Sequence, residues 1–399
     1  MKAPSIIIGA GGIGSSICAR VAEMMPANAP DRHQTRFVVM DTDVNTIREI
    51  QRKGFRGTAI CLSNNMTVGK CKDLMRDQIA DWYPQGETFN KKSMTEGAGQ
   101  QRAISRLALE YSLREGKLRP LHRVINELHE ISLQHSSQPI TFYIISSLAG
   151  GTGSGIVLPL SLYLNRYVVQ KQGDALSSCK GFFLLSNVLE ESVDSALEVQ
   201  SLDANSYAAL KELSAFMQVE DGDSEEGRYQ NLEHAFSLGR MRRRGGGGWW
   251  DHSYEYCFLF GLRNVKGHGI HSPVDLQNMV ARAVYMQACS PMQARNSSRE
   301  DNKVRHNSML QLKNSEAHMR RFGGIGCGEL CYPEEQLREY FSLCWAKDVM
   351  QGQWKKYDEL YRTRELEEVK KKSEGQKWIV VERGQEYINA VCSDNQSSL

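Results

Sequence analysis

The sequence predicts an α/β protein with a mainly parallel sheet flanked by helices. Short runs of β-branched and aromatic residues alternate with amphipathic helical segments over roughly 200 residues, as in successive βαβ units. Glycine clusters stand between a predicted strand and a predicted helix at two places, residues 9–14 and 150–155. Such loops, where a parallel strand ends and a helix begins, are typical of phosphate-binding sites.

The first part of the chain begins this alternation. A β-branched run at 5–8 stops at glycines, and an apolar run at 35–43 ends in acids. Between residues 55 and 95 the periodicity is weak, apart from one helix. The sequence predicts strands at 5–8 and 35–43 and helices at 15–25, 44–54, 70–82, 97–115 and 119–134.

The second part continues the alternation with one interruption. Residues 139–168 are typical of a strand, a glycine loop and a helix. An acidic stretch followed by arginines, glycines and tryptophans interrupts the pattern at 220–250. Further predicted elements are strands at 179–187, 254–262 and 378–382 and helices at 203–217, 275–289 and 334–372.

Composition excludes several classes of protein. The 399 residues include 41% hydrophobic and 24% charged residues, the profile of a soluble globular protein, and the net charge of +2 does not indicate a nucleic-acid partner. There is no apolar run of about 18 residues and no secretory pattern at the N-terminus, so we expect no membrane span. The ten cysteines lack zinc-type pairs, and we expect them to be reduced in a cytoplasmic protein.

The first glycine cluster satisfies the dinucleotide-binding fingerprint. Gly9, Gly11 and Gly14 have its spacing, and they follow a strand and open a helix. Asp41 ends the second predicted strand, where a ribose-binding acid belongs in such folds. These residues alone leave an NAD-dependent oxidoreductase open.

The second glycine cluster favours a ligand with more phosphate to surround. Four glycines follow Ala149, and we expect them to allow positive φ and a close approach to a ligand. Thr152 and Ser154 add hydroxyl donors, and the following helix points its free N–H groups at the loop. The P-loop pattern GxxxxGK[ST] is absent, which excludes the ordinary NTPase arrangement.

This second cluster resembles the signature of the tubulin/FtsZ superfamily. The family reads GGGTG[ST]G, and residues 149–155 read AGGTGSG, with alanine for the first glycine. Other loops follow in the family's order: Gly9–Gly14 is similar to the first nucleotide loop, Asp41–Asp43 to the second, and Gly97–Gln101 to the third, which contacts the γ-phosphate. The stretch 322–340 resembles a bacterial branch of tubulin-like proteins. The resemblance implies a GTPase-type fold that binds GTP or GDP with Mg²⁺.

The resemblance also implies the residues of the nucleotide site. Asn205 is similar to an asparagine that opens a helix in tubulin, and Asn264 and Gln277 lie where two guanine-reading asparagines would be, although Asn264 could also cap a loop. Asp43 could hold a Mg²⁺-bound water or act only as a helix N-cap. The full set of expected nucleotide-binding residues is Gly9, Gly11, Gly12, Ile13, Asp41, Asp43, Gly97, Ala98, Gly99, Gln100, Ala149, Gly150, Gly151, Thr152, Gly153, Ser154, Asn205, Asn264 and Gln277.

In the family, catalytic residues lie on a loop after the central helix and act on the nucleotide of the next subunit. Asn296 and Asp301 have the family's spacing of an asparagine and an acid, and Glu300 is an alternative acid. Ser298 replaces an intermediate acid of the family. An acid here would orient or deprotonate a water in line with the γ-phosphate. A solvated polar loop is the alternative.

The domain organisation follows from the resemblance, which covers residues 5–345. We expect a nucleotide-binding domain at 1–274 with a flexible insertion at 220–250, a central helix and candidate catalytic loop at 275–302, and a smaller α+β domain at 303–399 with a disordered tail. In the helix from 334, Leu337, Phe341, Trp345 and Val349 recur at helical spacing, and we expect them in the core.

Three functions from different classes follow. The first is a GTP-binding protein that assembles head to tail with copies of itself and hydrolyses GTP at the subunit contact. The second is a GTP-bound switch or scaffold that does not polymerise and that meets a partner protein through the 220–250 insertion or the C-terminal helix. The third is the NAD-dependent oxidoreductase.

Overall fold

The chain divides into two compact units, Met1–Cys327 and Gly328–Leu399. The domain boundaries predicted at 274 and 302 fall within the first unit and stay predictions. The computed structural model describes residues 3–29, 32–135, 139–172, 177–190, 193, 195–220, 253–263, 267, 269–270, 272–293, 321–327 and 334–354. The predicted strand at 378–382, the disordered tail and nearly all of the 220–250 insertion lie outside these residues.

Seven strands of the described residues form one sheet in the order β3-β2-β1-β4-β5-β6-β7. Every neighbouring pair is parallel, which confirms the predicted fold class. The strands are β1 Ser5–Ala10, β2 Thr35–Asp41, β3 Thr58–Cys61, β4 Thr141–Ser147, β5 Ser178–Leu184, β6 Tyr256–Phe260 and β7 Phe322–Gly323. The sequence did not predict β3, because four residues at a sheet edge carry too little alternation to be recognised.

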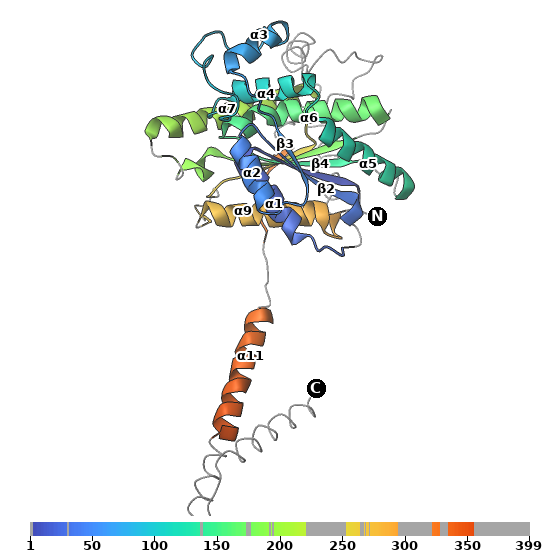
Figure 1. The fold of residues 1–399 in the computed structure, drawn as a ribbon, viewed down its shortest axis with the longest axis vertical. Coiled ribbons are helices and arrows are strands. Elements are labelled where there is room, and N and C mark those ends of the chain that lie inside the picture. The colour runs from blue at the N-terminus through green and yellow to red at the C-terminus, as the bar shows by residue number, and fades with distance from the viewer. Residues whose placement is uncertain are drawn as a thin grey trace, which may run out of the picture. The chain divides into compact units, whose positions relative to one another are not determined.

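Helices cover both faces of the sheet (Figure 1). Consecutive side chains of a strand point to opposite faces, so Ile6 and Ile8 of β1 belong to one buried cluster and Ile7 to the other, all with no exposed surface. The first face is covered by α3 Val68–Ile79, α4 Arg102–Arg114, α5 Arg119–His135, α6 Gly151–Gln172 and α7 Ala196–Glu220. The second is covered by α1 Gly11–Met24, α2 Val44–Arg52 and α9 Pro273–Val284, which continues as the π-helical turn Tyr285–Cys289.

The strand order places a switch point between β1 and β4. The chain runs outward from β1 through β2 to β3, and then returns to β4 on the other side of β1. In open parallel sheets, ligands bind beyond the carboxyl ends of the strands at such a point. The two glycine clusters follow β1 and β4, so the fold brings them together there.

Four helices begin well away from the predicted start. The helix α4, predicted from 97, begins at Arg102, and residues 97–101 lie before it. The helix α1 begins at Gly11 and α6 at Gly151, so the glycines form the first helical turns rather than loops before them. The helix α7 begins at Ala196, where the Ser195 hydroxyl accepts a hydrogen bond from the Glu198 N–H (3.2 Å).

The second unit contains the helix α11 Glu334–Val349, followed by a π-helical turn Met350–Trp354. The prediction of core residues here was wrong, because no residue of α11 is buried, and Phe341 and Trp345 are 62% and 60% exposed. Leu343, which is 64% exposed, lies two residues from both Phe341 and Trp345 and therefore on roughly the opposite side of the helix, so the apolar side chains do not form one stripe. Among the described residues no helix is long and apolar enough to cross a membrane.

Candidate functional site

The N-termini of α1, α4 and α6 meet at the carboxyl edge of the sheet. A Cβ built on Gly11, the first residue of α1, would lie 3.1 Å from the backbone nitrogen of Gly153 in α6. A Cβ built on Gly151 would lie 2.8 Å from the Cα of Gln100, just before α4. The three helix starts therefore touch through their backbones, and the first turn of each contains N–H groups that lack a carbonyl partner within the helix.

These helix starts differ from others in the molecule in how they are capped. Side chains accept hydrogen bonds from the first N–H groups of α2, α3 and α9, through Asp43, Thr67 and Ser272 respectively. No side chain caps α1, where the N-cap is Ala10, or α4, where it is Gln101. Free N–H groups and the positive end of the helix dipole make such a terminus suited to an anion.

A directed chain of hydrogen bonds joins the loop Asp41–Asp43 to the loop Gly97–Gln101 and to the glycine cluster at 150–155. The Ala98 N–H donates to the Thr42 hydroxyl (3.0 Å), and the Thr152 hydroxyl donates to Asp41 Oδ1 (3.1 Å). The two threonine hydroxyls lie 2.6 Å apart. Because Thr152 gives its one proton to Asp41, Thr42 must donate to Thr152. Thr42 was not among the predicted site residues, although it lies inside the motif that resembles the family's second loop.

The glycines of α6 serve close packing and not positive φ. None of the glycines between 150 and 155 has a positive φ, so the sequence-based expectation was wrong on this point. A Cβ on Gly153 would lie 2.9 Å from the Ser147 carbonyl, and one on Gly155 would lie under 3.0 Å from the Arg102 carbonyl. Of the four glycines between 150 and 155, only Gly150, which directly precedes α6, faces open space, because no atom lies within 4 Å of a Cβ built there.

Positive φ occurs instead in the first and third loops. Gly11 has φ +76°, and Gly97, Gly99 and Gln100 have φ +74°, +55° and +60°. Gln100 is the one described residue other than glycine with positive φ, a conformation that costs about 1–3 kcal/mol unless surrounding contacts hold it. Asn205 supplies such a contact, because its Nδ2 donates to the Gln100 carbonyl (2.9 Å).

Asn205 and Arg102 hold the loops from the side of α7. Asn205 lies inside α7 rather than at its start, and it donates to the carbonyls of Gln100 and Ala149, both at 2.9 Å. Arg102 donates to the Ser154 carbonyl (3.3 Å) and forms an ion pair with Glu212 of α7. Ser154 donates its hydroxyl proton to the Asn205 carbonyl (3.3 Å). The roles of Arg102 and Glu212 depend on contacts between distant segments, so the sequence offered no signal for them.

Two carboxyl groups stand at the end of β2. Asp41 is 3% exposed, and this burial raises the pKa of its carboxyl above the ordinary value of 3.8, although the Asp43 N–H and the Thr152 hydroxyl donate to it. Asp43 accepts from the N–H groups of Asn45 (3.0 Å) and Thr46 (3.3 Å), so it acts as the N-cap of α2. A carboxylate has about four acceptor positions, so this cap leaves room for a metal-bound water.

The described residues contain no cluster of three or more His, Cys, Asp or Glu side chains that could hold a metal ion directly. The donor set at the end of β2 fits a cation that keeps several waters, as Mg²⁺ does, better than one held by protein ligands alone.

Of the remaining predicted site residues, Gln277 and Ile13 are described, and within the described residues no side-chain hydrogen bond joins Gln277 to the loops. Gln277 lies in the first part of α9, which packs on α1, and the neighbouring Asn278 accepts a hydrogen bond from Arg20. The side chain of Ile13 packs against the buried cluster on that same face. Asn264, Asn296, Glu300 and Asp301 lie outside the described residues.

Comparison with solved structures found several that are similar to this chain. They include CetZ2 from Haloferax volcanii as a GTPγS-bound protofilament (14% identity, TM-score 0.38, 77% of this chain and 64% of that chain). They also include CetZ1 from the same organism as a GDP-bound monomer (13%, 0.35, 71% and 58%) and TubZ from Bacillus thuringiensis serovar israelensis as a GTPγS-form protofilament (10%, 0.33, 71% and 56%). This chain thus spans no more than 64% of any of these proteins.

No curated protein matches the sequence. A family profile described as "Tubulin like" does match it, over residues 6–351, and this span includes the four loops at 9–14, 41–43, 97–101 and 149–155 and all of the sheet except Ser5. The chain therefore belongs to the tubulin-like family.

Proposed function

We propose that this tubulin-like chain binds GTP and GDP, with the phosphates over the N-termini of α1, α4 and α6. One observation carries the proposal: α1 and α4 begin without a side-chain cap, and they touch α6 where Gly150 faces open space. An anion at that point would accept the free N–H groups of these helix starts and interact favourably with their dipoles. A triphosphate carries enough negative charge to interact with all of them.

Backbone groups are the main phosphate donors in this proposal. The hydroxyl protons of Thr152 and Ser154 are donated within the protein, to Asp41 and to the Asn205 carbonyl. Their part is to fix the loop geometry before the nucleotide binds, which reduces the cost of ordering the site. Gly12 and Gly150 leave room for the ligand, since a Cβ on either would meet nothing closer than 3.9 Å.

The cation belongs beside the second loop. Bound Mg²⁺ would offset phosphate charge, and Asp43 would hold one of its waters while it caps α2. On the base side, we propose that Asn264 and Gln277 recognise guanine, since a carboxamide offers both a donor and an acceptor to the base edge.

Hydrolysis requires a second copy of the chain. We propose head-to-tail assembly, in which Asp301, with Asn296 and Glu300, reaches the γ-phosphate bound by the neighbouring subunit. Asp301 would take a proton from a water as its oxygen attacks the γ-phosphorus, while the bond to the bridging oxygen breaks. A heterologous contact of this kind repeats without closing and produces a filament.

One sequence feature favours a second candidate function. Ser298 replaces an acid of the family's catalytic loop, which fits a protein that holds GTP without hydrolysing it and signals to a partner.

Turnover and light scattering against protein concentration distinguish the two candidates. For the assembling GTPase we expect turnover per chain to rise with concentration together with scattering, and Asp301→Ala to abolish turnover but keep GTP binding. Glu300→Ala tests the alternative acid, since loss of turnover in this variant with turnover kept in Asp301→Ala would assign the proton transfer to Glu300. GTP binding with no turnover or scattering in the presence of Mg²⁺ would favour the switch.

A further inference from the structure

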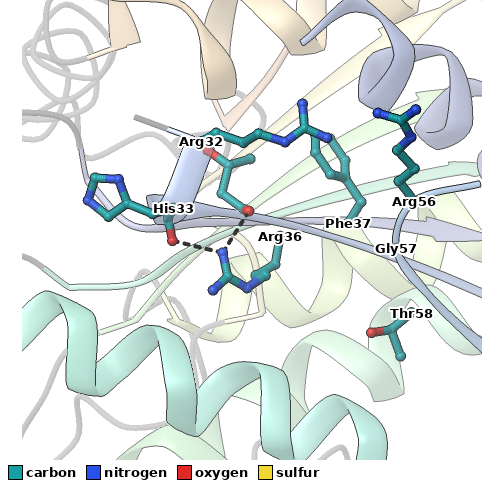
Figure 2. Close-up of a pocket in the computed structure, with 8 residues that line it drawn as sticks. Arg32, His33, Arg36, Phe37, Arg56, Gly57 and Thr58 are labelled. Carbon is teal, nitrogen blue, oxygen red and sulfur yellow. Dashed lines mark hydrogen bonds between the residues drawn. The ribbon is translucent and has the colours of Figure 1, made fainter. Parts of the chain in front are cut away.

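A cavity of about 360 Å³ lies at the opposite end of β2 from the phosphate loops. Its lining comes from the turn before β2, the first residues of β2 and the residues around the start of β3 (Figure 2). The strand β2 runs from Thr35 beside this cavity to Asp41 at the phosphate loops, a span of about 20 Å at the ordinary rise per residue. The cavity is therefore separate from the proposed nucleotide site.

The cavity is rich in positive charge. Arg32, Arg36 and Arg56 line it, and among the described residues no acidic side chain does. The guanidinium group of arginine is a planar cation that can only donate hydrogen bonds. In the part of the chain that the structure describes, none of the three arginines forms an ion pair with a carboxylate.

Backbone carbonyls position two of the guanidinium groups without neutralising them. Arg32 Nη1 donates to the carbonyls of Met25 (2.8 Å) and Pro26 (3.0 Å). Arg36 Nη1 donates to those of His33 (2.7 Å) and Thr35 (3.1 Å), as the dashed lines in Figure 2 show. A guanidinium has five N–H donors, so each keeps donors on Nε and Nη2 for another acceptor.

Arg56 is exposed and makes no hydrogen bond within the described residues. Figure 2 shows its side chain and that of Arg32 on the same side of the strand as the Phe37 ring, which is 5% exposed. The guanidinium groups of Arg32 and Arg56 therefore form a cationic site, and the buried Phe37 ring forms one wall of this site. Planar guanidinium groups match the oxygens of a phosphate through paired hydrogen bonds.

We propose that this arginine pocket binds a small anion with a diphosphate group, either free pyrophosphate or the diphosphate of a nucleotide. The cavity volume is in the range of small-molecule sites. An acidic peptide that adds a strand beside the start of β2, before its pairing with β3 begins at Val38, fits less well, because Gly57 lies against the Phe37 carbonyl, where its Cβ would be 2.6 Å away. The site goes beyond the proposed function and does not depend on it.

Calorimetric titration of the full chain with pyrophosphate, after one equivalent of GDP per chain has been added to occupy the proposed nucleotide site, tests the proposal. We expect one pyrophosphate per chain, and binding weakened about tenfold or more in Arg32→Ala/Arg56→Ala, as expected when charge-assisted hydrogen bonds are lost. Arg32→Lys/Arg56→Lys keeps the charge but not the planar donors, and we expect a loss of about threefold. Lys70→Ala/Arg76→Ala removes two exposed charges from α3 and should leave binding unchanged.

Several results would overturn the proposal. Unchanged binding in Arg32→Ala/Arg56→Ala, or an equal loss in the α3 control, would mean that pyrophosphate binds elsewhere or without a defined site. Tighter binding of a hexaglutamate peptide that displaces pyrophosphate would assign the pocket to acidic protein segments.

A second titration, with GDP alone, distinguishes free pyrophosphate from a nucleotide as the source of the diphosphate. If a nucleotide supplies it, a second GDP should bind, with the same dependence on Arg32 and Arg56. If GDP binds nowhere, the proposed function fails, but the pyrophosphate titration is still read in the same way.

Discussion

At the scale of single residues, two glycines of the proposed phosphate site, Gly14 and Gly150, have opposite surroundings. Gly14 lies against β4, where its Cβ would be 3.0 Å from the carbonyl carbon of Ile145 and 3.2 Å from the Cα of Ser146. Gly150 has no neighbour within 4 Å of a Cβ. The first glycine is needed for packing, and the second leaves space that the fold itself does not use.

This difference predicts opposite effects of the same substitution. Gly14→Ala should lower the free energy of unfolding by about 1–3 kcal/mol, because the methyl group meets backbone that cannot move aside. Gly150→Ala should leave stability unchanged or raise it by about 0.4–1 kcal/mol, since it restricts the unfolded chain, and it should weaken GTP binding. Denaturant unfolding of both variants measures the change in stability, and nucleotide titration measures the change in GTP affinity. Equal stability losses would contradict the packing argument, and full nucleotide affinity in Gly150→Ala would contradict the proposed site.

Asp41 predicts a dependence of stability on pH in the absence of ligand. Burial raises its pKa in the folded state above 3.8, so the folded state binds the proton more tightly than the unfolded chain. Its contribution to stability is therefore greatest below pH 3.8 and is lost as the pH rises through the raised pKa. Asp41→Asn removes this loss while its carbonyl oxygen still accepts the bonds from Asp43 and Thr152.

Urea unfolding from pH 3.5 to pH 7 of the wild type and Asp41→Asn measures the effect. The stability of the variant relative to the wild type should increase over this range. Asp73→Asn, at an exposed position of α3, is the matched control. A relative stability that decreases as the pH rises would show that Asp41 is stabilised as an anion, against this account.

At the scale of elements, the hydroxyls of Thr42 and Thr152 connect the loop Asp41–Asp43, the loop Gly97–Gln101 and the glycine cluster at 150–155. Thr42→Val keeps the shape of the side chain but leaves the Ala98 N–H without its acceptor, and Ala98 is 2% exposed. The expected cost is about 1–3 kcal/mol of unfolding free energy. Thr152→Val breaks the bonds to both Thr42 and Asp41, so the two changes affect one chain of hydrogen bonds.

A double-mutant cycle tests this connection. The double variant Thr42→Val/Thr152→Val should cost at least about 0.5 kcal/mol less than the sum of the two single variants, because each change removes the bond between the hydroxyls. Thr46→Val is a control, since its hydroxyl contacts only Asp43 at the start of α2. Additive costs would mean that the two hydroxyls act independently.

Sequence patterns predicted the elements better than the contacts between them. The alternation of strands and helices was sufficient for the parallel sheet and for the positions of the loops, because buried strands and amphipathic helices have different periods. The alternation did not predict the edge strand β3 or the start of α7, because the apolar pattern is short or absent there. The glycine cluster at 150–155 predicted a close approach, but which surface each glycine approaches depends on packing against β4 and α4.

The same limit applies to the site. Thr152 and Asp41 were expected from motifs, whereas Thr42, Arg102 and Glu212 act through partners more than fifty residues away in the chain. The pattern that resembles the family's first loop also fits an NAD-binding fold, and the strand order around β1 and β4 is common to both. Local sequence therefore predicted a phosphate site, which stays a prediction, and the family match over residues 6–351 identified the kind of protein.

At the scale of the whole molecule, the sheet separates two anion-binding regions in this account. The carboxyl edge has the helix N-termini for the proposed nucleotide, and the amino edge near β2 and β3 has the arginine pocket. A ligand that binds only the folded chain stabilises it by about 2.7 kcal/mol at a hundred times its dissociation constant. Both proposals can therefore be followed in the same protein by its resistance to unfolding.

The most direct test of the central claim is calorimetric titration of the purified chain with GTP, GDP, ATP and NAD in the presence of Mg²⁺. The account predicts one guanine nucleotide per chain at the glycine loops, where Gly150→Ala lowers GTP affinity without loss of stability, ATP binds more weakly and NAD does not bind. Binding of NAD with no binding of GTP or GDP would contradict it, and would assign the glycine loops to a dinucleotide.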